Sequence, residues 1–188
     1  VDRENKGRKQ CSVSVDDVHG GQLGIEYLTG LGHTDIAWVC GPDSIPQVAD
    51  RGAGVSKAAK FAGAKVETIR VSLMNTTQGE EAAKKILALK TTPTAIFCAN
   101  DLVALGVMRT LRENKFKIPE QVSVLGYDDI EFAASAAVPL SSISQPAYQM
   151  GVTAADLLLN ECEEAETHEH QQIRFQPQLV ERASTGKR

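Results

Sequence analysis

Three polar residues each follow a predicted buried strand. Asn100 comes directly after the apolar run 96–98, Asp128 follows the strand 122–126, and Arg51 opens a predicted helix beyond the strand 36–40. Ligands of open α/β sheets bind at the carboxyl ends of parallel strands, so these side chains are expected on one edge. An amide, a carboxylate and a guanidinium offer donors and acceptors in fixed directions, which suits a polyhydroxyl ligand. The sequence therefore predicts a small-molecule cleft. The alternative, in which Asn100 and Asp128 only cap helices and Arg51 lies on the surface, stays open.

The elements that would position these residues alternate along the chain. Buried apolar runs of strand length are followed by segments with helical periodicity, which is typical of βαβ units and a parallel sheet. The fold class predicted is α/β with a doubly wound parallel sheet. The expected strands are 11–15, 36–40, 66–71, 94–98, 122–126 and 173–175, and the expected helices are 18–31, 48–62, 77–89, 102–114 and 147–160. A capping box at 77–80 is expected to open the third helix, 139–144 to form an extended turn, and the acidic tract 161–169 a solvated loop.

Composition and charge narrow the classes of protein to which this chain could belong. The net charge of -4 and the scattered Lys and Arg residues argue against a nucleic-acid-binding surface. No apolar run is long enough to span a bilayer. The four cysteines, Cys11, Cys40, Cys98 and Cys162, form no C-x-x-C pair, and reduced thiols in a cytoplasmic protein are expected.

Motifs for catalysis or cofactor binding are missing from the sequence. There is no G-x-S-x-G elbow, no phosphate-binding G-x-x-x-x-G-K-[ST] loop and no G-x-G-x-x-G fingerprint. His168 and His170 stand two apart in the acidic tract and could hold a metal only weakly, and His33 is expected in a turn. We therefore expect no enzyme activity, no catalytic residue, no cofactor and no metal.

Several motifs together resemble the effector-binding part of bacterial transcriptional regulators of the lactose-repressor/galactose-repressor (LacI/GalR) family. The matching stretches are VDR at 1–3, VDDVHGG at 15–21, LGHTDIA at 31–37, RGAG at 51–54, PTAIFCAND at 93–101, VLGYDD at 124–129 and LVERAST at 179–185. Asp17 departs from the family pattern, which has Asn at that position.

The resemblance implies a periplasmic-binding-protein-like fold of type I with two lobes and an effector between them. Residues 18–145 would form a complete C-terminal lobe, 1–17 a remnant of the N-terminal lobe, 146–176 the crossover helix and strand that return to it, and 177–188 a C-terminal tail. The DNA-binding headpiece of the family would be missing, so operator DNA would be bound only through that absent part.

The resemblance also implies site residues. The effector, a sugar or a similar molecule, would be bound by Asp2, Arg51, Asn100 and Asp128. The pocket wall would include Gln47, Met74, Gln145 and Ala147. Family members often place an aromatic side chain where Met74 and Ala147 stand, so a ligand other than a simple hexose is expected.

The helix expected at 102–114 has apolar residues around most of its circumference, which indicates burial on more than one side. The segment after Asp129 is also unusually apolar for a surface connection. Together with the resemblance, this predicts a homodimer that contacts through Leu105, Met108, Phe132 and Ala136. The alternative is that these residues fill the chain's own core.

Two other functions stay open at this point. A periplasmic sugar-binding protein of a transporter would share the fold, and an α/β enzyme would share the architecture. The interpretation preferred here is the ligand-sensing domain of a regulator.

Overall fold

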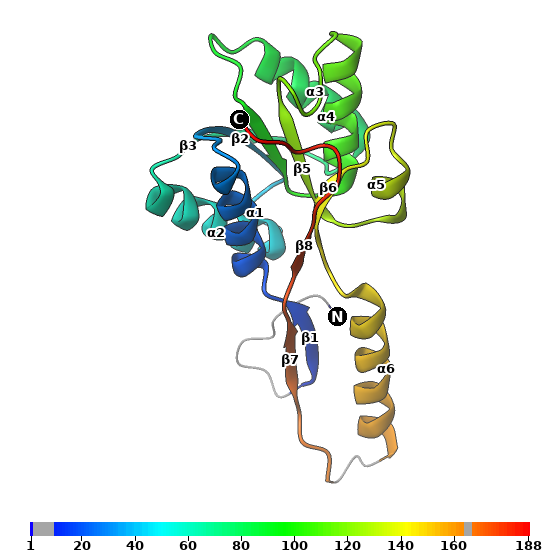
Figure 1. Ribbon diagram of the computed structural model, residues 1–188. Coiled ribbons are helices and arrows are strands. Elements are labelled where there is room, and N and C mark those ends of the chain that lie inside the picture. The colour runs from blue at the N-terminus through cyan, green and yellow to red at the C-terminus, as the bar shows by residue number, and fades with distance from the viewer. Residues whose placement is uncertain (2–9, 164–166) are drawn as a thin grey trace. The chain divides into compact units, whose positions relative to one another are not determined.

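The computed structural model describes residues 1, 10–163 and 167–188 (Figure 1). The chain divides into two compact units. Unit 1 comprises Val1–Asp16 and Gln145–Pro177, and unit 2 comprises Asp17–Ser144 and Gln178–Arg188.

Unit 2 is built on a six-stranded sheet. Its order is β3 (Lys65–Arg70), β2 (Asp35–Cys40), β4 (Ala95–Cys98), β5 (Ser123–Asp128), β6 (Ser141–Ser144) and β8 (Gln178–Val180). The first five strands are parallel, and β8 runs antiparallel to β6. The predicted α/β fold with a mainly parallel sheet is confirmed.

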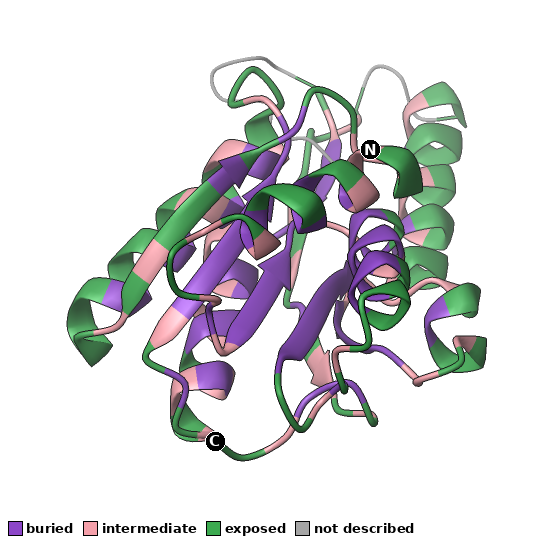
Figure 2. Cartoon of the chain, turned by 90° about the horizontal axis from the view of Figure 1, so that it is seen from above, coloured by how far each residue is buried: buried purple, intermediate pink, exposed green. Residues whose placement is uncertain are grey.

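Two layers of helices cover this sheet. Apolar residues of α1 (Asp17–Gly30) and α2 (Pro46–Ala62) pack on one face, and those of α3 (Thr76–Leu87) and α4 (Asp101–Glu113) pack on the other. Side chains of a strand alternate between the two layers, as the period of two requires, with Val39 facing α3 and α4 and Trp38 facing α1 and α2. The central strands are therefore buried on both faces, as Figure 2 shows in purple.

Unit 1 is smaller. Its strands β1 (Ser12–Val15) and β7 (Gln172–Phe175) form a parallel pair. The helix α6 (Ala147–Glu163) packs against them through a cluster whose buried members are Val13, Val15, Met150 and Leu157. Among the described residues, no helix combines the length and the apolar character that a membrane span needs.

Several local predictions were wrong. The turn expected at 139–144 contains the strand β6, and a short helix, α5 (Glu131–Ser135), follows β5. The helix α6 continues to Glu163, into the tract expected as a loop. The helix α3 is capped by Asn75, whose side chain accepts a hydrogen bond from the Gln78 amide, and not by Thr77.

The segment 177–188, expected as a tail, contributes to unit 2. Within it, β8 pairs with β6, and the Ser184 hydroxyl donates to the Val124 carbonyl at 2.6 Å while accepting from the Ser141 amide at 2.8 Å. These hydrogen bonds join residues more than forty positions apart in sequence, so local patterns did not predict them.

Candidate functional site

Arg51 lies at the centre of a buried polar network at the carboxyl edge of the unit 2 sheet. Only 4% of the residue is exposed. Its Nε donates to Asp17 Oδ1 at 2.7 Å, and its Nη1 donates to the Ala99 carbonyl, just beyond β4, at 2.6 Å. The guanidinium carbon stands 3.7 Å from the centroid of the Tyr127 ring, a cation–π contact. The guanidinium is thus fixed in direction by contacts on several sides.

Asp17 is the residue that the sequence analysis missed. It begins α1 and is almost fully buried. Its Oδ1 accepts hydrogen bonds from the Tyr127 hydroxyl at 3.0 Å and from Arg51 Nε. The available signal was its departure from the Asn that the family pattern has at this position. In the structure a carboxylate at this position neutralises a buried cation.

The electrostatics keep this network in defined protonation states. Burial by itself would lower the pKa of Arg51, but the negative charges of Asp17 and Asp128 and the hydrogen bond to Asp17 raise it overall. Burial is also the main cause that raises the pKa of Tyr127. Arg51 therefore remains a cation, and the Tyr127 hydroxyl remains a neutral donor.

The Gly20-Gly21 pair in α1 explains how these groups come so close. A Cβ atom at Gly20 would lie 2.1 Å from the Tyr127 hydroxyl oxygen, and one at Gly21 would lie 2.0 Å from the Arg51 carbonyl oxygen. Both distances are too short for any side chain. Glycine at 20 therefore leaves room for Tyr127, and glycine at 21 lets α1 approach α2.

Asp128 is the more accessible partner of Arg51. Its Oδ1 lies 3.6 Å from Arg51 Nη1, and 31% of its side chain is exposed. Asp128 has φ 101° and Asp129 has φ 54°, so two consecutive non-glycine residues adopt left-handed conformations. Such strain persists where the surroundings hold the backbone in place, which is frequent at binding sites.

Asn100 acts as the cap of α4. Its Oδ1 accepts from the Val103 amide at 2.9 Å, and its Nδ2 donates to the Met74 carbonyl at 3.1 Å. Asn100 therefore makes the helix-cap contact that the sequence analysis left open as an alternative. Asn100 also anchors the loop that carries Met74.

The neighbouring Asp101 is fully buried. Its two oxygens accept from the Ser142 hydroxyl at 2.7 Å and from the Ile130 amide at 2.9 Å. Burial raises its pKa to about 6, although these two hydrogen bonds act in the opposite direction. Asp101 therefore joins α4 to β6 and to the segment after β5.

The remaining predicted pocket residues divide between the units. Gln47 lies in the first turn of α2 and Met74 in the loop after β3, both partly buried in unit 2. Gln145 and Ala147 belong to unit 1, where Ala147 begins α6. Asp2 lies outside the described residues.

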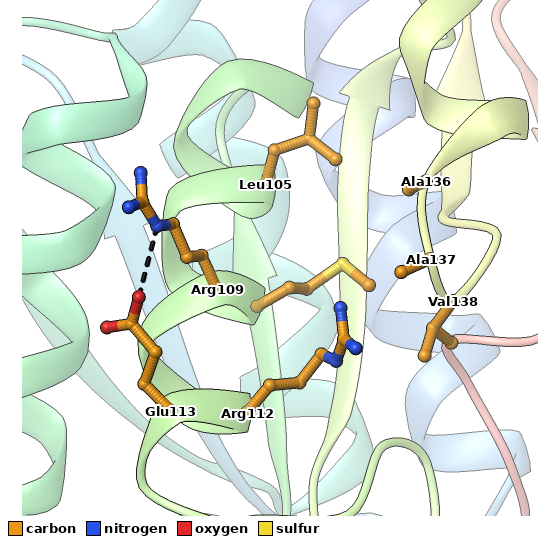
Figure 3. Close-up of a pocket in the computed structure, with 8 residues that line it drawn as sticks. Leu105, Arg109, Arg112, Glu113, Ala136, Ala137 and Val138 are labelled. Carbon is orange, nitrogen blue, oxygen red and sulfur yellow. Dashed lines mark hydrogen bonds and ion pairs between the residues drawn. The ribbon is translucent and has the colours of Figure 1, made fainter.

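Three of the four predicted dimer residues, Leu105, Met108 and Ala136, line a groove of about 500 Å³ on unit 2 (Figure 3). Leu105 and Met108 line it from α4, and Ala136, Ala137 and Val138 from the segment after α5. Arg109, Arg112 and Glu113 complete the lining. Met108 is only 4% exposed, so it belongs largely to the core, whereas Phe132 is 66% exposed.

A known protein family matches most of this chain. Residues 25–185 match the family described as periplasmic binding protein-like domain. The chain belongs to this family.

The relatives of this periplasmic-binding-protein-like chain include named regulators. It is 37% identical over 170 residues to the HTH-type transcriptional repressor PurR of Vibrio parahaemolyticus, an alignment that covers 89% of this chain and 51% of that protein. The chain thus spans about half the length of the curated relatives it matches.

Solved structures of LacI-family regulators have the same fold as this chain. The LacI family transcriptional regulator from Enterococcus faecium with bound ribose superposes with a TM-score of 0.90 at 28% identity, covering 98% of this chain and 68% of that one. A dimeric Lac repressor gives a TM-score of 0.89 at 29% identity, with coverages of 98% and 67%. The resemblance to LacI/GalR regulators is confirmed.

Proposed function

We propose that the chain is the effector-binding part of a bacterial transcriptional regulator, and that a sugar or chemically similar small molecule binds at the carboxyl edge of the unit 2 sheet. The observation that carries this proposal is the fixed, buried guanidinium of Arg51 beside a partly exposed carboxylate, Asp128. The bound ribose of the Enterococcus faecium relative supports the class of ligand.

The geometry suits hydroxyl groups. Because Asp17, Ala99 and Tyr127 already hold Arg51, a ligand would not have to order that side chain. The 3.6 Å between Arg51 Nη1 and Asp128 Oδ1 exceeds a good hydrogen bond. A ligand hydroxyl could accept from the guanidinium and donate to the carboxylate at the same time.

The effector class can be tested with the protein expressed from the intact gene. A thermal-shift screen of sugars, nucleosides and phosphosugars would find the ligand, and calorimetry would then compare Asp128→Ala with wild type. We expect affinity to fall about 10- to 150-fold, the cost of losing a charged hydrogen-bond partner. Asp35→Ala is the matched control, because Asp35 begins β2 at the opposite edge of the sheet. If Asp128→Ala and wild type bind the effector with equal affinity, the effector does not bind at Asp128.

The regulatory role predicts coupling between effector and DNA. In a gel-shift titration of the intact protein, the effector should change operator affinity, and operator should change effector affinity by the same factor. An intact protein that binds the effector but no operator DNA would favour the transporter receptor. We accordingly propose a cytoplasmic protein without enzyme activity or cofactor.

The homodimer is part of the same proposal. Leu105 on α4 is partly exposed and lines the groove in Figure 3, and Phe132 on α5 is 66% exposed, so a second copy could cover apolar surface on both elements. A two-fold dimer also provides the spacing that reading a palindromic operator requires. The dimeric Lac repressor among the structural relatives supports this assembly.

A further inference from the structure

Unit 1 brings together four side chains that the sequence keeps far apart. Cys11, Glu161, His168 and His170 each present one potential ligand atom, and these atoms lie within 4.8 Å of one another. The Cys11 sulfur is 3.0 Å from His168 Nε2 and 4.0 Å from His170 Nδ1. The two imidazole rings meet edge to face with their centroids 5.4 Å apart.

The topology of unit 1 creates this cluster. Because β1 and β7 are parallel and in register from Ser12 and Gln172, the residues just before each strand lie at the same end of the pair. Cys11 precedes β1, and the histidines precede β7. Glu161 stands in the last turn of α6, the helix that leads into this segment.

We propose that Cys11, Glu161, His168 and His170 form a binding site for a single divalent transition-metal ion, with Zn²⁺ the ion that the donors fit best. The sequence analysis expected no metal because it considered the two histidines alone, in an acidic loop. The structure adds a sulfur and a carboxylate to them.

The donor set is selective. A thiolate, two neutral imidazoles and a carboxylate carry a total charge of −2, which Zn²⁺ neutralises. Sulfur and nitrogen donors disfavour Mg²⁺ and Ca²⁺. Zinc bonds of about 2.0–2.3 Å at tetrahedral angles separate neighbouring ligand atoms by about 3.3–3.8 Å. The 3.0 and 4.0 Å separations at Cys11 lie on either side of that interval, and all four ligand atoms lie within 4.8 Å of one another, so movements of about 1 Å would bring them to tetrahedral distances.

A hydrogen bond from the backbone supports the sulfur as a ligand. The Gln171 amide donates to Cys11 Sγ at 3.4 Å. Metal ligands commonly receive such support from a second layer of groups, which orients them. The Ser12 amide in turn donates to the Gln171 carbonyl at 2.9 Å, so the β1–β7 pairing holds this peptide in place.

The ion would supply stability where unit 1 has little of its own. In the described part of this unit, the apolar cluster has four buried members, Val13, Val15, Met150 and Leu157. A metal would tie the end of α6 and the segment before β7 to the start of β1. Small units often use a structural metal in this way.

The test uses the tag-free chain in a thiol-free reductant, with Co²⁺ as the spectroscopic probe and Zn²⁺ measured by competition. We expect one ion per chain, with a thiolate-to-cobalt charge-transfer band and visible bands of tetrahedral intensity. Cys11→Ser should abolish the charge-transfer band and weaken Zn²⁺ binding at least 100-fold.

Cys162→Ser is the matched control. Cys162 is an exposed thiol next to Glu161 but is not one of the four ligands, so its variant should bind like wild type. His170→Gln is a second variant that spares the fold, because His170 is exposed, and it should weaken binding while the charge-transfer band remains. Absence of that band in wild type, its persistence in Cys11→Ser, or its loss in Cys162→Ser would overturn the proposal.

Discussion

The structure predicts that Asp17→Ala is among the most destabilising single substitutions in unit 2. It would remove the buried carboxylate that accepts from Arg51 at 2.7 Å and from Tyr127 at 3.0 Å. Asp17 and Arg51 are 6% and 4% exposed, so water cannot replace the lost contacts without opening the packing between α1 and α2.

The expected magnitude follows from what remains around Arg51. Removing one partner of a buried ion pair costs about 3–5 kcal/mol. Arg51 would keep the Ala99 carbonyl, the Tyr127 ring and the more distant Asp128, which favours the lower end of that range. We expect the free energy of unfolding to fall by about 3 kcal/mol, and Tm by roughly 6–12 °C for a chain of this size. Asp17→Asn keeps one acceptor at nearly the same volume and should cost about 1–2 kcal/mol.

Trp38 provides the assay. It is the only tryptophan in the sequence, it is 3% exposed in unit 2, and its ring centroid lies 4.8 Å from that of Phe97. Its fluorescence during urea unfolding therefore reports unit 2. Asp128→Ala is the control, since its 3.6 Å, partly exposed contact with Arg51 should contribute less than about 1 kcal/mol.

Two results would refute this reasoning. One is a loss below about 1 kcal/mol for Asp17→Ala. The other is an equal loss for Asp17→Ala and Asp128→Ala. Either would mean that the buried pair does not hold α1 and α2 together as the contacts imply.

Three further predictions concern other parts of unit 2. Burial raises the pKa of Asp101 from its ordinary 3.8 to about 6, so the stability it contributes is present below about pH 3.8 and is lost as pH rises through about 6. The free energy of unfolding of Asp101→Asn, measured in urea titrations relative to that of wild type, should therefore rise by on the order of 3 kcal/mol between pH 4 and 7. A difference between the two proteins that stays constant with pH would contradict this. Leu105→Glu should shift the chain from dimer to monomer in sedimentation at micromolar concentration, because it buries a charge in the apolar contact; a wild-type monomer would rule that interface out. Gly20→Ala should displace Tyr127, whose hydroxyl lies 2.1 Å from the new Cβ position, and should cost about 1–3 kcal/mol in the same urea assay, whereas Gly30→Ala, with open space around it, should cost nothing.

Sequence patterns were most informative where structure is local. The run 95–98 is apolar at every position, which is typical of strands buried on both faces, and the observed β4 is buried along its whole length. The expectation that Arg51 and Asp128 share one edge also followed from the pattern, because parallel strands end together. In the structure, Arg51 Nη1 lies 3.6 Å from Asp128 Oδ1.

Some positions carried an ambiguous signal. An Asn at the end of a strand and the start of a helix suits both a ligand and a cap, and only the 2.9 Å contact with the Val103 amide shows which contact it makes. The strand β8 was missed because a three-residue strand has too few residues to show a period.

The sequence by itself determined the alternation of elements, the doubly wound sheet and the edge where its polar residues gather, because these depend on side-chain periodicity within a few residues. The tertiary structure decided which groups meet. Asp17 becomes the partner of Arg51 because Gly21 lets α1 approach α2 and Gly20 leaves room for the Tyr127 ring. Cys11 reaches His168 across 157 positions only because β1 and β7 pair in parallel. No short-range pattern encodes contacts that depend on the packing of distant segments.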